Sequence, residues 1–324
     1  MVQELDFSDK NMIKKINKFL LSNKWAEYNQ TIEWNIIRNE KIKFYLYSVN
    51  ELKEVMWVCS LVEKKDGSIK NIYANRGPVL NYNDNSIIKK FIDEIKKWML
   101  EHNYTKLIIN PKIKEDILKN VMKKVDYKVM NKNDYINLKD AYKQAVIEII
   151  YDENEMMKRM DYHIRRNTIK AYKNELKYKI SYEIDIDKFY ELYKDTSKRH
   201  EFIAHDIEYF KKILKVFKNK IIFIEVLKDN IPIAMAIDLV YKGKLVYLYG
   251  ASSTLYREKR GMYIVHWEAI KYCIKNHIKE YDMGGVFCDG NDIKSKDYGL
   301  YRLKKGYCYN KFQEYVPDII INFN

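Results

Sequence analysis

The chain has few of the residues that build metal sites and cross-links. Its four cysteines are scattered and form no CxxC pair, which indicates reduced thiols rather than disulfides or zinc ligands. In "HEFIAH", His200 and His205 are five positions apart, whereas the histidines of a zinc-binding HExxH motif occupy i and i+4 on one helical face. We therefore predict no metal site.

Long apolar runs and flexible linkers are also missing. No uncharged run reaches 18 residues, so no membrane-spanning helix is expected. The stretch "MVQELDFSDK" is acidic and lacks an apolar signal region, which favours a cytoplasmic location. Only four prolines and 10 glycines occur among 324 residues, and no Gly/Ser-rich linker separates the halves. This length suits two domains of about 100–200 residues each.

Positive charge is what the chain has in excess. The formal net charge is +14, a value that suggests a nucleic-acid partner. However, Ile, Lys, Asn and Tyr are all abundant, as an AT-rich coding bias produces, so part of the surface lysine is compositional drift. The distribution of the charge is therefore more informative than its total.

Residues 156–179, "MMKRMDYHIRRNTIKAYKNELKYK", form the densest basic segment, with eight cations against two carboxylates. Arg166, Lys170, Lys173 and Lys177 recur at helical spacing, and Arg165 precedes them. One face of a single helix would then bind a phosphate backbone without reading its sequence. The alternative is a solvated lysine-rich face, which charge runs commonly form.

The first half shows a meander followed by a helix. The stretches 43–49, 54–64 and 69–80 are apolar and β-branched, and "KKDGS" forms a turn between the last two, so we predict three strands. Residues 85–104 have apolar side chains at helical spacing, and 105–111, "TKLIINP", follow as a strand.

The second half repeats this order. Strands are predicted at 220–229, 231–243 and 244–252, a helix at 262–278 and a further strand at 279–285. When Glu94 is placed on Glu268, some 174 positions later, helix, loop and strand align without a gap. We interpret this as one supersecondary unit used twice.

An antiparallel meander, a helix and a further strand are the order of an N-acyltransferase core. We therefore predict an α/β (α+β) fold with two tandem GNAT-like domains and mixed, mainly antiparallel sheets. In acetyl-CoA enzymes of that fold, a Q/R-x-x-G-x-G/A loop holds the pyrophosphate at a helix N-terminus. Here Gly261 is present, but Tyr263 occupies the second small position, which argues against acetyl-CoA.

Four stretches, taken together, resemble a known family: "NRGPVL", "RRNTIKAYKNELKYKI", "YLYGASSTLYREKRGMYIVHWEAIKYCIKNHIKEYDMGG" and "GLYRLKKGY". They are similar to the FemABX family, the aminoacyl-tRNA-dependent peptidoglycan bridge-forming transferases. The resemblance spans most of the chain and is strongest at 245–307. It implies two acyltransferase-like domains, for which we expect 1–148, completed by 312–324, and 149–311. No long heptad segment occurs, so the chain resembles the compact branch without a coiled-coil arm.

The resemblance also implies catalytic residues. The family's F-K-x-G-F motif falls on "LKKGY", so its lysine maps to Lys304, in a predicted strand and turn where Gly299 and Gly306 allow close backbone approach. Lys305 is the alternative, on the opposite face of such a strand. Asp282 matches the family's "DFGG" position and acts directly or orients Lys304.

Acceptor-binding residues are implied in the same way. The family's acceptor groove maps to Tyr256 and Arg257, and "NRGPVL" adds Arg76. Two phosphate anchors of members that bind nucleotide-linked muropeptides fall on Asn29 and on His205, the latter four residues before Tyr209. Asn cannot form an ion pair and His does so only when protonated, so a lipid-linked precursor or a non-murein amine remains open.

The implied reaction is transfer of an amino acid from aminoacyl-tRNA to an amine, with a peptidoglycan stem peptide as the expected acceptor. The donor is a co-substrate, and no cofactor is implied. Arg165, Arg166, Lys170 and Lys173 are the expected tRNA-binding residues. The alternatives are an acyl-CoA-dependent N-acyltransferase and a non-catalytic RNA-binding module. Peripheral membrane association is expected if the acceptor is lipid-linked, and no stable protein partner is expected.

Overall fold

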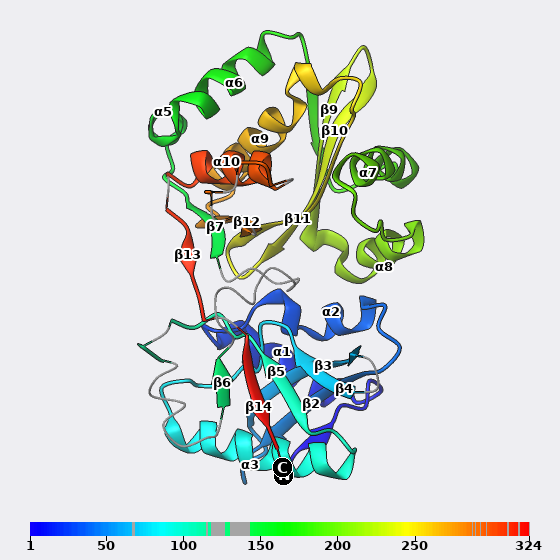
Figure 1. Ribbon diagram of the computed structural model, residues 1–324, viewed down its shortest axis with the longest axis vertical. Helices are drawn as coiled ribbons and strands as arrows, with labels where there is room; N and C mark the ends of the chain where they lie inside the picture. Colours follow the sequence, from blue (N-terminus) through cyan, green and yellow to red (C-terminus); the bar gives the residue numbers. More distant parts are fainter. Residues whose placement is uncertain are drawn as a thin grey trace. The chain divides into compact units, whose positions relative to one another are not determined.

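The computed structural model (Figure 1) forms two compact units, 1–142 with 314–324, and 143–313. The structure describes residues 1–66, 69–114, 116–117, 127–129, 143–286, 288, 290–291, 293–295, 297–309, 311–316 and 318–323. Each unit is a seven-stranded mixed sheet with helices. In the described part of the chain, the helices are all too short or too polar to cross a bilayer.

The sheet of the first unit has the order β1-β2-β3-β4-β5-β14-β6. Its strands are β1 (Gln3–Glu4), β2 (Lys43–Val49), β3 (Val55–Asp66), β4 (Ile69–Ala74), β5 (Lys106–Ile109), β6 (Tyr127–Val129) and β14 (Ile319–Asn322). Neighbours pair antiparallel except β4 and β5, which are parallel because a helix connects them. The predicted meander is confirmed.

The connecting helix, α3 (Asn85–Glu101), shows why the sequence folds in this way. The Asp84 side chain caps its start by accepting from the backbone N–H groups of Ser86 and Ile87. Its apolar stripe is buried against the sheet, with side chains Ile88, Phe91, Ile95, Trp98 and Met99. Three further short helices precede the meander: α1 (Lys10–Ser22), η1 (Tyr28–Gln30) and α2 (Ile32–Ile37).

The sheet of the second unit has the order β13-β7-β12-β11-β10-β9-β8. Its strands are β7 (Lys143–Glu148), β8 (Lys177–Ser181), β9 (Ile221–Lys228), β10 (Ile231–Tyr241), β11 (Lys244–Ser252), β12 (Glu280–Val286) and β13 (Gln313–Glu314). The second predicted meander, 220–252, is confirmed, and so are its helix and following strand. Both sheets are mainly antiparallel, which confirms the predicted fold class.

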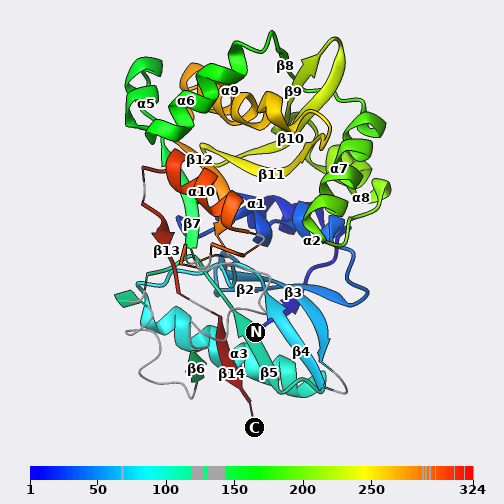
Figure 2. The same cartoon turned by 45° about the horizontal axis from the view of Figure 1, so that its top comes forward.

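Helices cover both faces of this second sheet (Figures 1 and 2). Helices α7 (Ile186–His200) and α8 (Ile207–Phe217) lie on one face, and α9 (Gly261–Lys275) lies on the other, packed by α6 (Tyr162–Tyr172). The remaining helical segments are α5 (Glu153–Arg159), η3 (Lys218–Lys220), η4 (Arg257–Lys259) and α10 (Tyr298–Tyr307). A Cβ on Gly261 would lie 2.8 Å from the Ala234 Cβ, so glycine lets α9 begin directly against β10.

The segment containing Lys304 is a helix, and the predicted strand and turn at this position is wrong. Residues 298–307 form α10, whose buried positions Lys304, Gly306 and Tyr307 face its neighbours. A Cβ on Gly306 would overlap the Ile164 side chain of α6, whereas one on Gly299 would meet nothing within 4 Å. Close approach therefore explains Gly306 but not Gly299.

The basic segment 156–179 is also not one helix. It comprises the end of α5, the whole of α6 and the start of β8. Asp161 caps α6, accepting from the backbone N–H of His163, and ends the preceding segment. Lys177 begins β8, so its predicted place on the helical cationic face is wrong.

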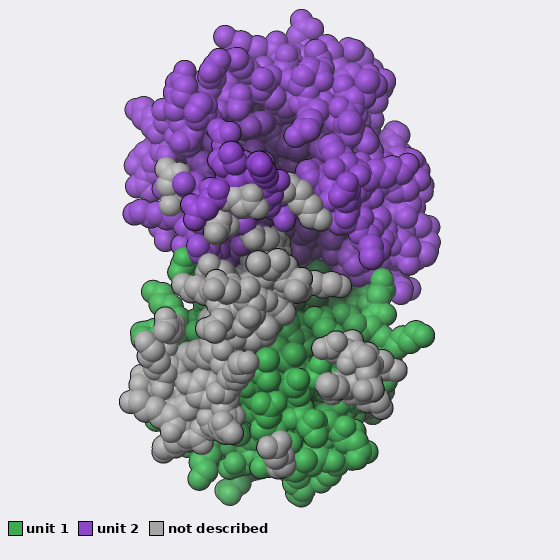
Figure 3. Space-filling view, in the orientation of Figure 1, with its two compact units in different colours: residues 1–142, 314–324 green, residues 143–313 purple. Residues whose placement is uncertain are grey.

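The division into units differs from the expected boundaries (Figure 3). β7 pairs antiparallel with β12 and so belongs to the second unit, not to a first domain ending at 148. β14 pairs with β5 and β6, which places residues 319–322 in the first sheet.

Candidate active site

The sheet of the second unit opens between two of its central strands. β11 and β12 pair in parallel at only three positions, Lys244–Val246 with Glu280–Asp282. Beyond them β11 continues along β10, and β12 continues along β7. Both strands change register near this point, β10–β11 at Ile237/Asp238 and β12–β7 between Asp282 and Gly285. Such irregularities bend strands apart, which leaves a split at the C-terminal ends of β11 and β12.

Lys304 lies beside this split. Its Nζ donates a hydrogen bond to the Gly285 backbone oxygen over 2.7 Å, and the residue is only 6% exposed. Burial lowers its pKa to about 8, although Asp282, Asp297 and Cys308 favour the charged form. The ammonium group is therefore charged at neutral pH but weakly solvated, which makes it an effective partner for a developing oxyanion.

Asp282 stabilises the turn at Gly284, next to the Gly285 oxygen that Lys304 contacts. Its Oδ1 accepts from the Gly284 backbone N–H over 2.8 Å, and Gly284 has a φ of +82°. The carboxylate is buried and favours the charged form of Lys304. These contacts fit the predicted orienting role of Asp282.

α9 carries a buried polar side chain, His266, next to Tyr307 of α10. His266 Nδ1 lies 2.9 Å from the Tyr281 hydroxyl, and its ring packs edge-on against Tyr307. Burial, together with the charge of Lys304, lowers the pKa of His266 to about 3, so the ring is neutral. Nothing in the sequence pattern distinguished His266 from the apolar residues of its helix.

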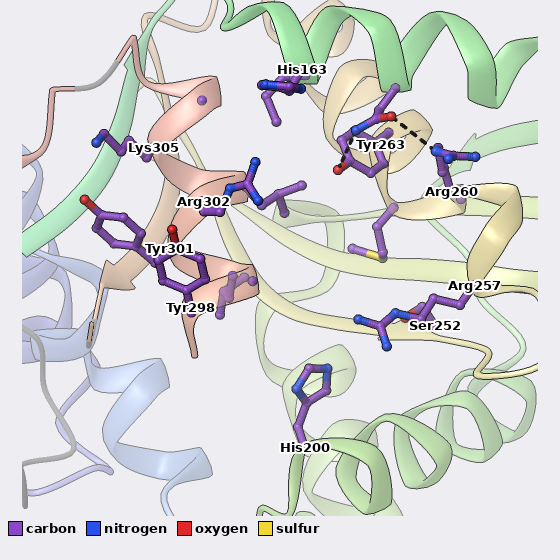
Figure 4. Close-up of a pocket in the computed structure, with 18 of the residues that line it drawn as sticks. His163, His200, Ser252, Arg257, Arg260, Tyr263, Tyr298, Tyr301, Arg302 and Lys305 are labelled. Atoms are coloured by element: carbon purple, nitrogen blue, oxygen red, sulfur yellow. Dashed lines mark hydrogen bonds between the residues drawn. The ribbon is translucent and has the colours of Figure 1, made fainter. Parts of the chain in front are cut away.

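A cavity of about 760 Å³ opens at the start of α9 (Figure 4). Its walls come from α6, the end of α7, the end of β11, the η4–α9 segment and α10. The cationic side chains among its lining residues are Arg199, Arg257, Arg260, Arg302 and Lys305, joined by His163 and His200. Asp161 is the single carboxylate among the lining residues in the described part of the chain. Such a balance suits an anionic ligand.

Arg199 is held at the cavity wall by the end of β11. Its Nη1 donates to the Ser252 oxygen at 3.0 Å and to the Thr254 Oγ1 at 2.7 Å, and Nη2 donates to the Ser252 Oγ at 2.8 Å. Burial and nearby Arg257 lower the pKa of Arg199, against the opposing effect of Asp195. Two guanidinium groups are thus gathered close together, where an anion would relieve their repulsion.

Tyr263 is fixed in the wall at the N-terminus of α9. Asn167 Nδ2 donates to the Tyr263 hydroxyl at 3.1 Å, and Arg260 Nε donates to Asn167 Oδ1 at 3.2 Å (Figure 4). Arg260 is in the left-handed conformation, with a φ of +61°. The tyrosine that replaces the second small residue of the acetyl-CoA loop is therefore part of an ordered side-chain network.

The structure brings some predicted site residues together. Tyr256 and Arg257 line the cavity, and Lys304 and Asp282 flank Gly284–Gly285. Lys305, the alternative to Lys304, also lines the cavity.

His205 and Tyr209 form a separate aromatic group in the second unit. Their rings stack at 4.1 Å, with 17° between the planes. The Tyr209 hydroxyl lies 2.8 Å from that of Tyr249 on β11. Sequence reasoning missed Tyr249, although strand alternation in "YLYGAS" was a usable signal for it.

The two other acceptor-binding predictions fall in the first unit. Asn29 is buried in η1. Arg76 is buried after β4 with a φ of +56°, and its backbone N–H donates to Asn110 Oδ1 at 2.6 Å. Both residues therefore have structural surroundings within the first unit.

The residues predicted to bind tRNA divide into two kinds. Arg166, Lys170 and Lys173 are exposed on α6 and its C-cap. Arg165 is partly buried, and its Nη1 donates to the backbone oxygens of Lys158 and Met160 at 2.6 and 2.7 Å. Arg165 thus fixes the turn between α5 and α6 rather than extending the exposed face.

The fold and the site define a transferase with two GNAT-like units, of which the second carries a cationic cavity. The FemAB family model matches residues 13–226 and 223–317, so the chain belongs to the FemAB family. This confirms the family resemblance found in the sequence.

Relatives support the same class. Aminoacyltransferase FemA of Staphylococcus epidermidis is 23% identical over 358 residues, covering 85% of each chain. Aminoacyltransferase FemA of Staphylococcus aureus is 22% identical, covering 96% of this chain and 94% of its own. The crystal structure of FemX matches with a TM-score of 0.82 at 18% identity, over 99% of this chain and 98% of that chain. A tandem GNAT protein from the clavulanic acid biosynthesis pathway matches with a TM-score of 0.55 at 6% identity, over 100% of this chain and 98% of that chain.

Proposed function

We propose that this protein is an aminoacyltransferase that moves an amino acid from aminoacyl-tRNA to an amine of a peptidoglycan precursor, as in interpeptide bridge formation. The observation that carries the proposal is the buried ammonium group of Lys304 beside the β11–β12 split, in the unit that also has the cationic cavity. Relatives named aminoacyltransferases match 85% and 96% of the chain, which supports the same class of reaction.

The cavity suits the phosphates and bases of a single-stranded RNA end. Arg199, Arg257 and Arg260 offer guanidinium groups to phosphate oxygens. Tyr298 and Tyr301 from α10 lie 6.1 Å apart with nearly parallel rings, and both line the cavity. Aromatic faces of this kind stack on bases without sequence preference. The exposed cations of α6 would contact the phosphate backbone of the rest of the donor.

The chemistry that this site must provide is limited. An ester of a ribose hydroxyl is already activated, and a neutral amine is a good nucleophile. The protein therefore has to position the two groups and to stabilise the oxyanion that forms on the ester carbonyl. Lys304 supplies the cation for that oxyanion, and Asp282 holds the turn beside it.

The proposed acceptor is an amine on a stem peptide. An aromatic group suited to recognition of the stem peptide is formed by His205, Tyr209 and Tyr249. We also propose that the buried residues Asn29 and Arg76 contribute to acceptor binding. Asn29 and His205 provide no permanent cation for a nucleotide diphosphate, which argues against a nucleotide-linked precursor and leaves a lipid-linked precursor or a non-murein amine as the acceptor. We place the enzyme in the cytoplasm, with peripheral membrane association when the acceptor is lipid-linked.

Purified protein incubated with charged tRNAs and cell-wall precursors, and in parallel with acyl-CoA, tests the proposal. Mass spectrometry should detect a precursor increased by one or more aminoacyl residues in the tRNA reaction only. Acylation from CoA, or no product with any charged tRNA, would contradict it. Tyr263 in the position of a small residue of the CoA loop is the physical reason to expect no CoA reaction.

A further inference from the structure

The segment that follows β11 is joined to α7 through one residue, Thr254. Its backbone N–H donates to Asp195 Oδ2 over 2.7 Å, and its hydroxyl donates to Asp195 Oδ1 over 2.7 Å. The same hydroxyl accepts from Arg199 Nη1 over 2.7 Å. The hydroxyl therefore acts as donor and acceptor at once, which among side chains of this size only threonine and serine can do.

Thr254 also contacts the second arginine of the cavity wall. The Arg257 backbone N–H donates to the Thr254 backbone oxygen over 3.4 Å. Thr254 thus joins Arg199 through its side chain and Arg257 through its main chain. Among the described residues, both arginines line the cavity, whereas Asp195 and Thr254 do not. An effect of Asp195 on a ligand must therefore pass through the residues that it holds.

The charge of Asp195 is the opposite of what an anion site needs. A carboxylate beside two guanidinium groups weakens the binding of a phosphate through its charge alone. Burial lowers the pKa of Arg199, whereas Asp195 raises it and Arg257 lowers it. The carboxylate therefore offsets the repulsion between the two arginines when no anion is bound, and cations that are already in place bind a phosphate at a lower ordering cost.

We propose that Asp195 and Thr254 are positioning residues for the donor, which hold Arg199 and Arg257 in place for a phosphate near the 3′ end of the RNA. This inference rests on the proposed function. It gives a role to two residues that lie 59 positions apart in the sequence and to which the family resemblance assigned none. Neither residue forms or breaks a bond of the reaction.

The variant Asp195→Asn separates positioning from charge, because the two effects have opposite signs. If only charge matters, loss of the carboxylate should strengthen RNA binding. If Asp195 positions the arginines, binding should weaken by about 3–10-fold, because an amide has one oxygen for the two Thr254 donors. Fluorescence anisotropy measures binding, and the probe is a non-acylated RNA hairpin of an acceptor stem with a single-stranded 3′ end.

Variants of Thr254 test the same contact without a change in charge. Thr254→Val keeps the shape of the side chain and removes the hydroxyl, so RNA binding should again weaken by about 3–10-fold. Thr254→Ser restores the hydroxyl and should bind within about twofold of wild type. Thermal unfolding of each variant establishes that it is folded at the assay temperature, and the comparison of Val with Ser separates the lost hydrogen bonds from a general loss of stability.

The control for charge is Glu258→Gln on η4. This exposed side chain forms an ion pair with Lys259 at 3.8 Å, and its loss removes the same charge as Asp195→Asn. RNA binding should stay the same or strengthen by up to about twofold.

Kinetics of transfer show at which step the two residues act. Asp195→Asn and Thr254→Val should raise KM for aminoacyl-tRNA by about 3–10-fold and leave kcat within about twofold of wild type, because Lys304 is unchanged once the donor is bound.

The outcomes are distinguishable from those of the proposed function. RNA binding by Asp195→Asn that equals or exceeds wild-type binding overturns the inference and leaves the proposed function standing. The same holds if Thr254→Ser binds RNA no better than Thr254→Val. Absence of both RNA binding and transfer in the wild type overturns both.

Discussion

At the scale of single residues, the site depends on a lysine that is buried yet charged. Burial lowers the pKa of Lys304 to about 8 from 10.5. The negative charges of Asp282 and Asp297 keep the pKa from falling further. A charged group in a weakly solvated position stabilises an oxyanion better than one in bulk water. The same burial brings the deprotonation of Lys304 close to neutral pH.

The first prediction concerns the alkaline side of the pH profile. If Lys304 must be charged, kcat should fall as pH rises through about 8, because the folded-state pKa lies there. Transfer rates measured from pH 6 to 10 should show this limb. A rate that stays flat to pH 9.5 would contradict a role for the Lys304 cation.

The second prediction concerns Asp238, a fully buried carboxyl of β10. Neither of its oxygens has a hydrogen-bond partner in the part of the chain that the structure describes, and burial raises its pKa well above the usual range. An acid whose folded-state pKa is raised costs stability as pH rises above its unfolded value of 3.8. Asp238→Val should therefore increase the free energy of unfolding by ~1–3 kcal/mol at pH 8, and by less at pH 4.

Urea unfolding at both pH values measures this effect. The exposed Asp93→Ala is the control and should change stability by no more than ~0.5 kcal/mol. A loss of stability in Asp238→Val at pH 8 would mean that the carboxyl has a stabilising partner.

At the scale of elements, the position of the site depends on how α10 packs against α6. The Gly306 position faces Ile164 and Asp161 so closely that a Cβ there would lie 3.2 Å from the Asp161 Cβ and overlap the Ile164 side chain. α10 carries Lys304 on its buried side, and Tyr298, Tyr301 and Arg302 are among its residues that line the cavity. The α6–α10 contact therefore positions both.

The third prediction uses the two glycines of α10 as a matched pair. Gly306→Ala should destabilise the protein by ~1–3 kcal/mol through overpacking. Gly299→Ala should stabilise it by up to ~1 kcal/mol, because alanine favours the helix and its Cβ meets nothing within 4 Å. Thermal unfolding of both variants checks this, and equal effects would show that helix propensity alone governs both positions.

Local periodicity predicted most elements, and long-range packing explains the errors. The meanders and α3 and α9 follow from patterns that lie within each segment. In α10, the glycines Gly299 and Gly306 led to the wrong prediction of a turn. The close contact with Ile164, which a Cβ at position 306 would overlap, is the reason for a glycine there. Lys304 and Tyr256 were found through sequence motifs. Arg199 and Arg302 line the cavity because segments distant in the sequence meet there, and residue spacing in a single sequence does not reveal such a meeting.

At the scale of the whole molecule, the distribution of the positive charge fits an RNA donor. The net charge is +14, and Arg166, Lys170 and Lys173 are exposed on and just after α6. Phosphate contacts of this kind release counterions, so they set the salt dependence of binding.

The fourth prediction is a charge reversal on α6. Arg166→Glu with Lys170→Glu should weaken tRNA binding and reduce the slope of log K against log salt by about 2, one for each lost contact. Lys89→Glu with Lys96→Glu on α3 makes the same change in net charge on the exposed face of the first unit and is the control. Equal loss in the two double variants would show that total charge, rather than α6, determines binding.

The central claim is that Lys304 stabilises the oxyanion of aminoacyl transfer, and kinetics of its alanine variant test it most directly. With charged tRNA and a peptidoglycan precursor, Lys304→Ala should lower kcat by ~10²–10³-fold while tRNA binding stays the same. Lys305→Ala should mainly raise KM for the tRNA, and Lys275→Ala, exposed on α9, should change neither. A Lys304→Ala enzyme with wild-type kcat would contradict the account.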